Sequence, residues 1–241
     1  MLAKKWESAS FTHVGNVRKV NEDSTLNEPQ LGIWAVADGM GGHSAGDVAS
    51  QMIVSALGLL KNQGKLSDWV NRIDEKLLDI NRRLLGLAEK EGGKRVIGST
   101  VVALAAVESG HAVCAWVGDS RLYRLRGDVL EQLSQDHSQV EEMIMRKELL
   151  RENAEKHPVA NVITRAIGGD SQLFVDFEWI ELQAGDRYLL CSDGLYKELT
   201  DEAIAELLAE KNSPQLTAHA LVGNALSGAC KDNVSVVVVD I

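Results

Sequence analysis

Four short apolar segments, rich in Val, Leu, Ala and Trp, each meet an aspartate at one end. The aspartates are Asp38, Asp119, Asp193 and Asp232, and the segments are 34–37, 112–118, 189–192 and 234–239. Such segments belong inside a sheet whose faces are covered. Carboxylates at the ends of several core strands would repel one another and resist desolvation unless a cation joins them. Hard divalent cations take oxygen ligands, so the four aspartates together favour a magnesium or manganese site, although any one alone fits an ordinary turn.

The length and charge set bounds on the class of protein. A chain of 241 residues can bury a sizeable core, and no Pro-, Gly- or Ser-rich linker divides it, so we expect one domain over residues 1–241. Lys plus Arg number 25 against 35 Asp plus Glu, which gives a net charge of −10. That balance argues against nucleic acid or an anionic membrane surface as the main partner.

Cysteine usage and the N-terminal residues indicate the compartment. Cys114, Cys191 and Cys230 lie in or beside apolar segments, which predicts buried free thiols in a reducing environment. Residues 1–7 lack the apolar core of a signal peptide, and no run approaches membrane-spanning length. We therefore expect a cytoplasmic protein.

Periodicity predicts two helices after the first apolar strand, which we expect over residues 30–37. Ser44 and Asp47 resemble a capping box, and apolar residues from Ala49 to Leu60 then recur on one helical face. A second helix follows Ser67, with apolar residues stepping by three and four up to residue 87. This stripe fits a coiled-coil seam or a helix covering a sheet, and the second is favoured for so short a run.

From residue 99 the period changes to two. Four alternating runs separated by turns predict an antiparallel meander over residues 100–107, 112–117, 121–125 and 129–133. Residues 139–157 are charged and helical in pattern, without an apolar face, and suggest a flap over a site. The remaining chain predicts a half-buried strand from Leu173 to Trp179, a core strand at 188–192, and helices at 201–210 and 215–229. Strands grouped together and helices grouped together indicate an α+β fold.

Seven motifs resemble, in the same order, those of the metal-dependent PP2C-type protein phosphatases, and are most similar to the compact bacterial members. They extend over nearly the whole chain, residues 11–241. They are Arg-Lys-Val-Asn-Glu-Asp at 18–23, Ala-Asp-Gly-Met-Gly-Gly-His-Ser-Ala-Gly at 37–46, Gly-Ser-Thr at 98–100, Val-Gly-Asp-Ser-Arg at 117–121, Asp-His-Ser at 136–138, Cys-Ser-Asp-Gly-Leu at 191–195 and Asp-Asn-Val at 232–234.

The resemblance implies a sandwich of two antiparallel β-sheets flanked by α-helices, with a small flap, about residues 139–160, near the metal site. It implies hydrolysis of phosphoserine and phosphothreonine in proteins, with two Mn²⁺ or Mg²⁺ ions in the core site and room for a third, weaker one. The expected partners are phosphorylated proteins, a Ser/Thr kinase or its targets, and the expected state is a monomer.

The resemblance also implies roles for individual residues. Asp38 would bridge both metals, with a further ligand from the Gly39 carbonyl, and Asp193 and Asp232 would hold one of them. Asp119 with Asp193 would form the third site, while Glu22 and Asp23 would orient metal-bound waters. Arg18 would clamp the phosphate, and His43 is the candidate general acid. His137 is expected to make a structural contact near the flap.

Other chemistries fit the same residues less well. The Gly-rich stretch after Asp38 lacks the third glycine and the later acidic residue of a dinucleotide fingerprint. It also lacks the Lys and Ser/Thr of a phosphate-binding P-loop, and the chain has neither a Gly-x-Ser-x-Gly nucleophile nor a Cys followed six residues later by Arg. An inactive module of the same fold should have lost a metal carboxylate or the arginine, and none is lost. The sequence also fits a phosphatase that acts on small metabolites.

Overall fold

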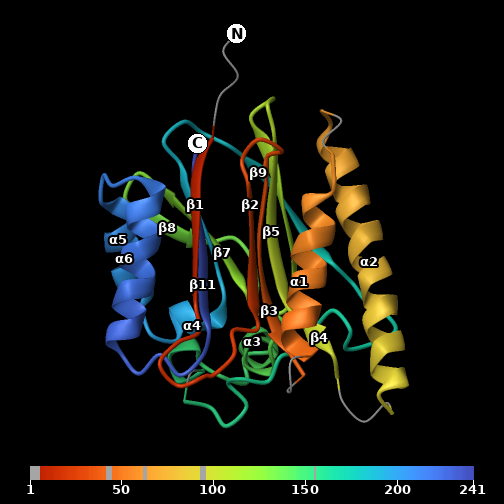
Figure 1. Ribbon diagram of the computed structural model, residues 1–241. Helices are drawn as coiled ribbons and strands as arrows, with labels where there is room; N and C mark the ends of the chain where they lie inside the picture. The colour runs from red at the N-terminus through yellow and green to blue at the C-terminus, as the bar shows by residue number, and fades with distance from the viewer. Residues whose placement is uncertain (1–5, 42–44, 62–63, 93–95, 155) are drawn as a thin grey trace.

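The computed structural model describes residues 6–41, 45–61, 64–92, 96–154 and 156–241. Its strands form two antiparallel sheets (Figure 1). The first sheet has the order β1 (Glu7–His13), β11 (Val234–Asp240), β10 (Arg187–Cys191), β7 (Arg121–Arg126) and β8 (Val129–Gln132). The second has the order β2 (Asp23–Glu28), β3 (Ile33–Met40), β5 (Val101–Val107), β6 (His111–Val117) and β9 (Asp176–Glu181), and β4 (Gly98–Ser99) pairs with the end of β3.

Helices cover the outer face of each sheet (Figure 1). On the second sheet lie α1 (Ala45–Gly58), which packs against β2 and β3, and α2 (Leu66–Lys90), which packs against β5 and β6. The apolar stripes of both helices join the core of this sheet, with residues such as Ile53 and Leu77 fully buried. On the first sheet lie α4 (Asp193–Tyr196), α5 (Asp201–Ala209) and α6 (Pro214–Ser227). A third apolar cluster, which includes the fully buried Trp34 and Tyr188, fills the space between the sheets. The layers are thus helix, sheet, sheet, helix, and the predicted fold class is confirmed.

The predicted meander is wrong at one point. The chain leaves the second sheet after β6 and enters the first with β7, so β6 pairs with β5 and β9 while β7 pairs with β8 and β10. The corner is made by Gly118, which has a φ of +106° and lies against Thr100 so closely that a Cβ atom there would come within 2.6 Å of its side chain. Since β5 and β6 are buried on both faces, their sequences carry no signal for which sheet they join.

Two further predictions are corrected in detail. Strand β3 continues past Asp38 to Met40, because β4 supplies backbone partners for Gly39 and Met40. Trp179 does not face the core: its exposed fraction is 60%, and it packs on His111, whereas Ile180 is the buried residue of β9.

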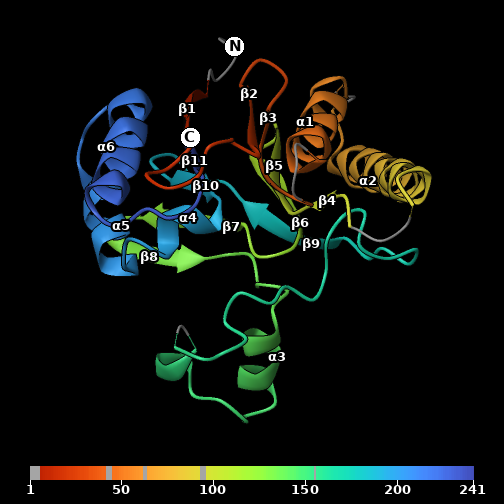
Figure 2. The ribbon, with the colours of Figure 1, turned by 60° about the horizontal axis from the view of Figure 1, so that its bottom comes forward.

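The charged segment after β8 forms only a short helix, α3 (Gln139–Met145), and a turn of 3₁₀ helix, Arg151–Asn153. The helix ends before the predicted residue 157, since Lys147 adopts a positive φ of 60°. The segment lies apart from both sheets (Figure 2). A backbone bridge between Ser138 and Ile163 closes its base.

No helix among the residues that the structure describes is both long enough and apolar enough to cross a membrane. All three cysteines are buried free thiols, as predicted.

Candidate metal centre

The strand-end aspartates lie close enough together for the charges of Asp119, Asp193 and Asp232 to act on Asp38. Helices α3 and α4 and strand β4 lie together at one end of the sandwich (Figure 1). Asp38, near the end of β3, is opposite Asp23 in the antiparallel pair with β2. The Ser192 hydroxyl, at the end of β10, donates to Asp23 Oδ2 at 2.8 Å and so joins the two sheets at this point. The residues predicted as ligands from both sheets are therefore brought together.

The electrostatics of this cluster are unfavourable without a cation. Burial raises the pKa of Asp38 well above its usual range, and the charges of Asp23, Asp193, Asp119 and Asp232 raise it further. Burial also raises the pKa of Asp23 to about 7, against the hydrogen bonds from Ser235 and Ser192 that lower it. The pKa of Asp119 is likewise raised to about 7 by burial and by Asp193. Carboxylates that raise one another's pKa in this way need a positive ion between them to stay ionised together.

Two oxygen atoms in the cluster support the same conclusion. Asp23 Oδ1 and Asp193 Oδ1 are buried and accept no hydrogen bond from any described residue. Leaving a buried carboxylate oxygen without a partner is costly, so such atoms are rare in folded proteins. The donor set is entirely oxygen, which suits Mg²⁺ or Mn²⁺. The residues present therefore fit a divalent metal site.

Two cations of the chain itself hold the outer carboxylates. Arg18 Nη2 donates to Asp232 Oδ2 at 2.8 Å, and Lys197 Nζ forms a close ion pair with Asp193 Oδ2. Within the described ranges, no group of three His, Cys, Asp or Glu side chains is arranged to hold a metal ion. Arg18 and Lys197 thus each neutralise one oxygen of the cluster.

The backbone at Gly39 and at Gly46 is packed too tightly to admit a side chain at either position. A Cβ atom on Gly39 would come within 2.0 Å of the Gly46 carbonyl oxygen, and one on Gly46 within 2.7 Å of Glu22 Oε1. Glycine at both positions lets the start of α1 lie directly on the Gly39 backbone. The Glu22 backbone lies beside Gly39, because the Glu22 carbonyl accepts a hydrogen bond from the Gly39 amide at 3.1 Å.

Asn233 has a positioning role that the sequence did not reveal. Its Oδ1 accepts from the Glu22 amide at 2.8 Å, and its Nδ2 donates to the carbonyls of Val14 and Val20 at 2.9 and 3.0 Å. These bonds fix the loop that carries Arg18 beside Asp232. Lys197 was also missed; its signal was the spacing of four residues from Asp193 on a short helix.

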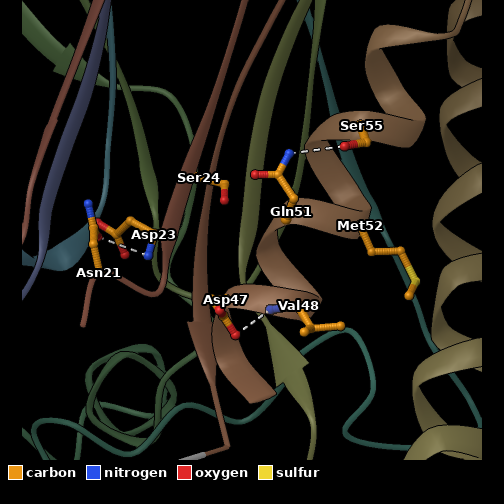
Figure 3. Close-up of a pocket in the computed structure, with 8 residues that line it drawn as sticks. All are labelled: Asn21, Asp23, Ser24, Asp47, Val48, Gln51, Met52 and Ser55. Carbon is orange, nitrogen blue, oxygen red and sulfur yellow. Dashed lines mark hydrogen bonds between the residues drawn. The ribbon is translucent and has the colours of Figure 1, made fainter. Parts of the chain in front are cut away.

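A pocket of about 520 Å³ opens beside the cluster, between β2 and α1 (Figure 3). Asp23 lies on one side of it and the polar side chains of α1 on the other. The lining residues are Asn21, Asp23, Ser24, Asp47, Val48, Gln51, Met52 and Ser55. The pocket therefore lies beside the cluster and shares Asp23 with it.

The structure describes one of the two histidines for which the sequence predicted a role. His43 lies outside the described residues, so its role as general acid stays a prediction. His137 makes the structural contact expected of it: its Nδ1 accepts from the Gly118 amide at 3.1 Å, and its Nε2 lies 2.9 Å from Asp176 Oδ2.

Comparison with known proteins gives the family. The model of the protein phosphatase 2C family matches residues 16–223. The chain belongs to the PP2C family. The serine/threonine phosphatase stp of Listeria monocytogenes is 35% identical over 239 residues, which cover 95% of this chain and 93% of that protein. The solved structure of PppA from Pseudomonas aeruginosa is 42% identical with a TM-score of 0.91, over 99% of this chain and 98% of that one.

A further solved structure is of the catalytic domain of the phosphatase PstP in complex with two manganese ions. It is 34% identical with a TM-score of 0.86, over 98% of this chain and 97% of that one. The chain is accordingly a metal-dependent serine/threonine protein phosphatase, and the predictions of family, fold and enzyme class are confirmed.

Proposed function

We propose that the chain hydrolyses phosphoserine and phosphothreonine in proteins at the carboxylate cluster around Asp38. The observation that carries this proposal is the set of buried aspartates that raise one another's pKa around two unpartnered oxygens, Asp23 Oδ1 and Asp193 Oδ1. Two Mn²⁺ or Mg²⁺ ions bound there would offset the charge of the phosphate and lower the pKa of the attacking water.

The proposed ligands are the residues at the strand ends. The charges of Asp23, Asp119, Asp193 and Asp232 all act on Asp38. It would be shared between the two ions, and the Gly39 carbonyl would add a ligand to one of them. Asp193 and Asp232 would hold the other ion. Asp23 and Glu22 are proposed to orient water molecules.

Arg18 is proposed as the phosphate clamp. Its side chain is 52% exposed and forms its ion pair with Asp232 at the rim of the cluster. A planar guanidinium can bind two phosphoryl oxygens at once, and an exposed one can turn from a carboxylate to a phosphate. His43 is proposed to give a proton to the seryl or threonyl oxygen as it leaves. The pocket beside Asp23 offers room for residues that flank the phosphorylated one.

The proposal extends to the setting of the enzyme. Residues 1–241 would act as a single monomeric domain, with residues 139–160 as a flap beside the site. The substrates would be a bacterial Ser/Thr kinase or its targets, in the cytoplasm. This expectation is supported by the phosphatase relatives and by the net charge of −10, which is unsuited to nucleic acid.

The test is phosphate release from matched phosphothreonine and phosphotyrosine peptides, with Mn²⁺ and with excess EDTA. We expect rapid Mn²⁺-dependent release from the phosphothreonine peptide and none after chelation. Full activity in EDTA would refute the metal mechanism. Activity on small phosphate esters without activity on either peptide would instead favour a metabolite phosphatase.

A further inference from the structure

The side chain of Lys197 is paired with Asp193, one of the two carboxylates for which a third metal ion was expected. Lys197 directly follows helix α4, four residues after Asp193, and its Nζ forms a close ion pair with Asp193 Oδ2. The Asp193 side chain is 13% exposed and the Lys197 side chain 36%. The pair is thus partly buried, where an ion pair is screened less than at the surface.

The two oxygens of Asp193 have different surroundings. Oδ2 accepts from Lys197, whereas Oδ1 is buried and has no partner among the described residues. Oδ1 is therefore the oxygen left for a metal of the core site. Oδ2, which a third metal would have to share with Asp119, already has a cation.

Asp119 lies near the same ammonium group. The charge of Lys197 acts on Asp119 as well as on Asp193. A lysine side chain carries its proton at neutral pH, so Lys197 presents a positive charge to both carboxylates.

Arg121, which is close to Asp119 in sequence, is engaged with other residues. Arg121 donates to both oxygens of Asp136, at 2.7–3.1 Å, and stacks over the ring of Tyr196 with its Cζ 3.6 Å from the ring centroid. The Tyr196 hydroxyl in turn donates to the Asp119 carbonyl at 3.0 Å. These contacts hold the Asp119 backbone against α4 and leave Lys197 to face the carboxylates.

We infer that the ammonium group of Lys197 serves as the third cation of this site, so that the chain binds two divalent ions and not three. The inference rests on the proposed function, since it concerns the outer side of the same metal centre. A permanent ammonium satisfies Asp193 Oδ2 at any metal concentration, whereas a weakly held divalent ion would satisfy it only when the ion is abundant.

The experiment counts bound Mn²⁺ by equilibrium dialysis and elemental analysis, from micromolar to low-millimolar free Mn²⁺. We expect wild type to saturate at two ions per chain and Lys197→Met, which keeps much of the side-chain length without the charge, to reach three. Lys197→Arg keeps a positive charge and should stay at two. Lys211→Met, which removes an exposed lysine from the loop before α6, is the matched control and should also stay at two.

A double variant identifies the place of the extra ion. Adding Asp119→Asn to Lys197→Met should return the count to two, because the third ion would lose one of its two carboxylates. Three ions bound by wild type would overturn the inference, as would two ions bound by a folded Lys197→Met. The wild-type count decides the question even if Lys197→Met does not fold. No Mn²⁺ bound by wild type would instead refute the proposed metal centre.

Discussion

The metal-free protein should lose stability as the pH rises from 5 to 8, because of the buried carboxyl groups. The pKa of Asp23 is about 7 in the folded protein against an ordinary value of 3.8. Below pH 3.8 the group is protonated in both states, and its stabilising contribution is fully present. As the pH rises toward 7, the unfolded chain releases the proton while the folded chain retains it, so the folded state becomes less favourable.

The size of the effect follows from the same values. At about 1.4 kcal/mol per pKa unit, Asp23 alone should remove about 3 kcal/mol of unfolding free energy between pH 5 and pH 8. Asp119, whose pKa is also about 7, adds a loss of the same sign. For a domain with a total stability of roughly 5–15 kcal/mol, such a loss is large enough to measure.

The assay is urea unfolding of EDTA-treated protein at intervals from pH 5 to pH 8. Asp23→Asn cannot ionise, so the variant should lose about 3 kcal/mol less than wild type over this interval. Asp128→Asn, in the exposed turn between β7 and β8, is the matched control and should follow wild type. Saturating Mn²⁺ should remove or reverse the trend, because the ion binds the ionised carboxylates. A stability of the metal-free protein that stays level or rises from pH 5 to pH 8 would refute this reasoning.

The other predictions concern activity. Asp38→Asn should lower turnover by orders of magnitude without lowering the metal-free melting temperature, since it removes one of several repelling charges; a clear drop in that temperature would make Asp38 structural. Arg18→Ala should mainly raise KM for both phosphopeptides and p-nitrophenyl phosphate. His43→Ala should mainly lower kcat, and far more for phosphopeptides, whose leaving group needs a proton; equal losses on both substrates would exclude the acid role. Alkylating reagents should leave activity intact, because burial raises the pKa of the Cys114 and Cys191 thiols; rapid inactivation would contradict this.

Local patterns predicted the helices, the core strands and the aspartates at the strand ends, whereas the sandwich of two sheets was implied by the resemblance to the PP2C family. The apolar stripes of α1 and α2 identify their buried faces, and the runs ending at Asp38 and Asp193 identify core strands. Strand β1 was not predicted: it alternates less clearly, and its place in the sheet depends on pairing with β11 at the other end of the chain.

The parts of the site that were missed depend on contacts distant in sequence or on a single charge. Asn233 and the Glu22 amide are 211 positions apart, so nothing in either local sequence reveals their bond. The ion pair of Lys197 with Asp193 follows ordinary helical spacing, which many exposed helices share without function. Its meaning depends on the buried carboxylates around it, and only the folded arrangement brings these together.

The most direct test of the proposed metal centre is an anomalous difference map from crystals of the protein loaded with Mn²⁺. We expect two strong peaks in contact with Asp38, one of them also touching Asp193 and Asp232, and the Gly39 carbonyl beside the other. Strong peaks elsewhere, or ordered Asp38 and Asp193 side chains with no peak at saturating Mn²⁺, would contradict the proposed centre.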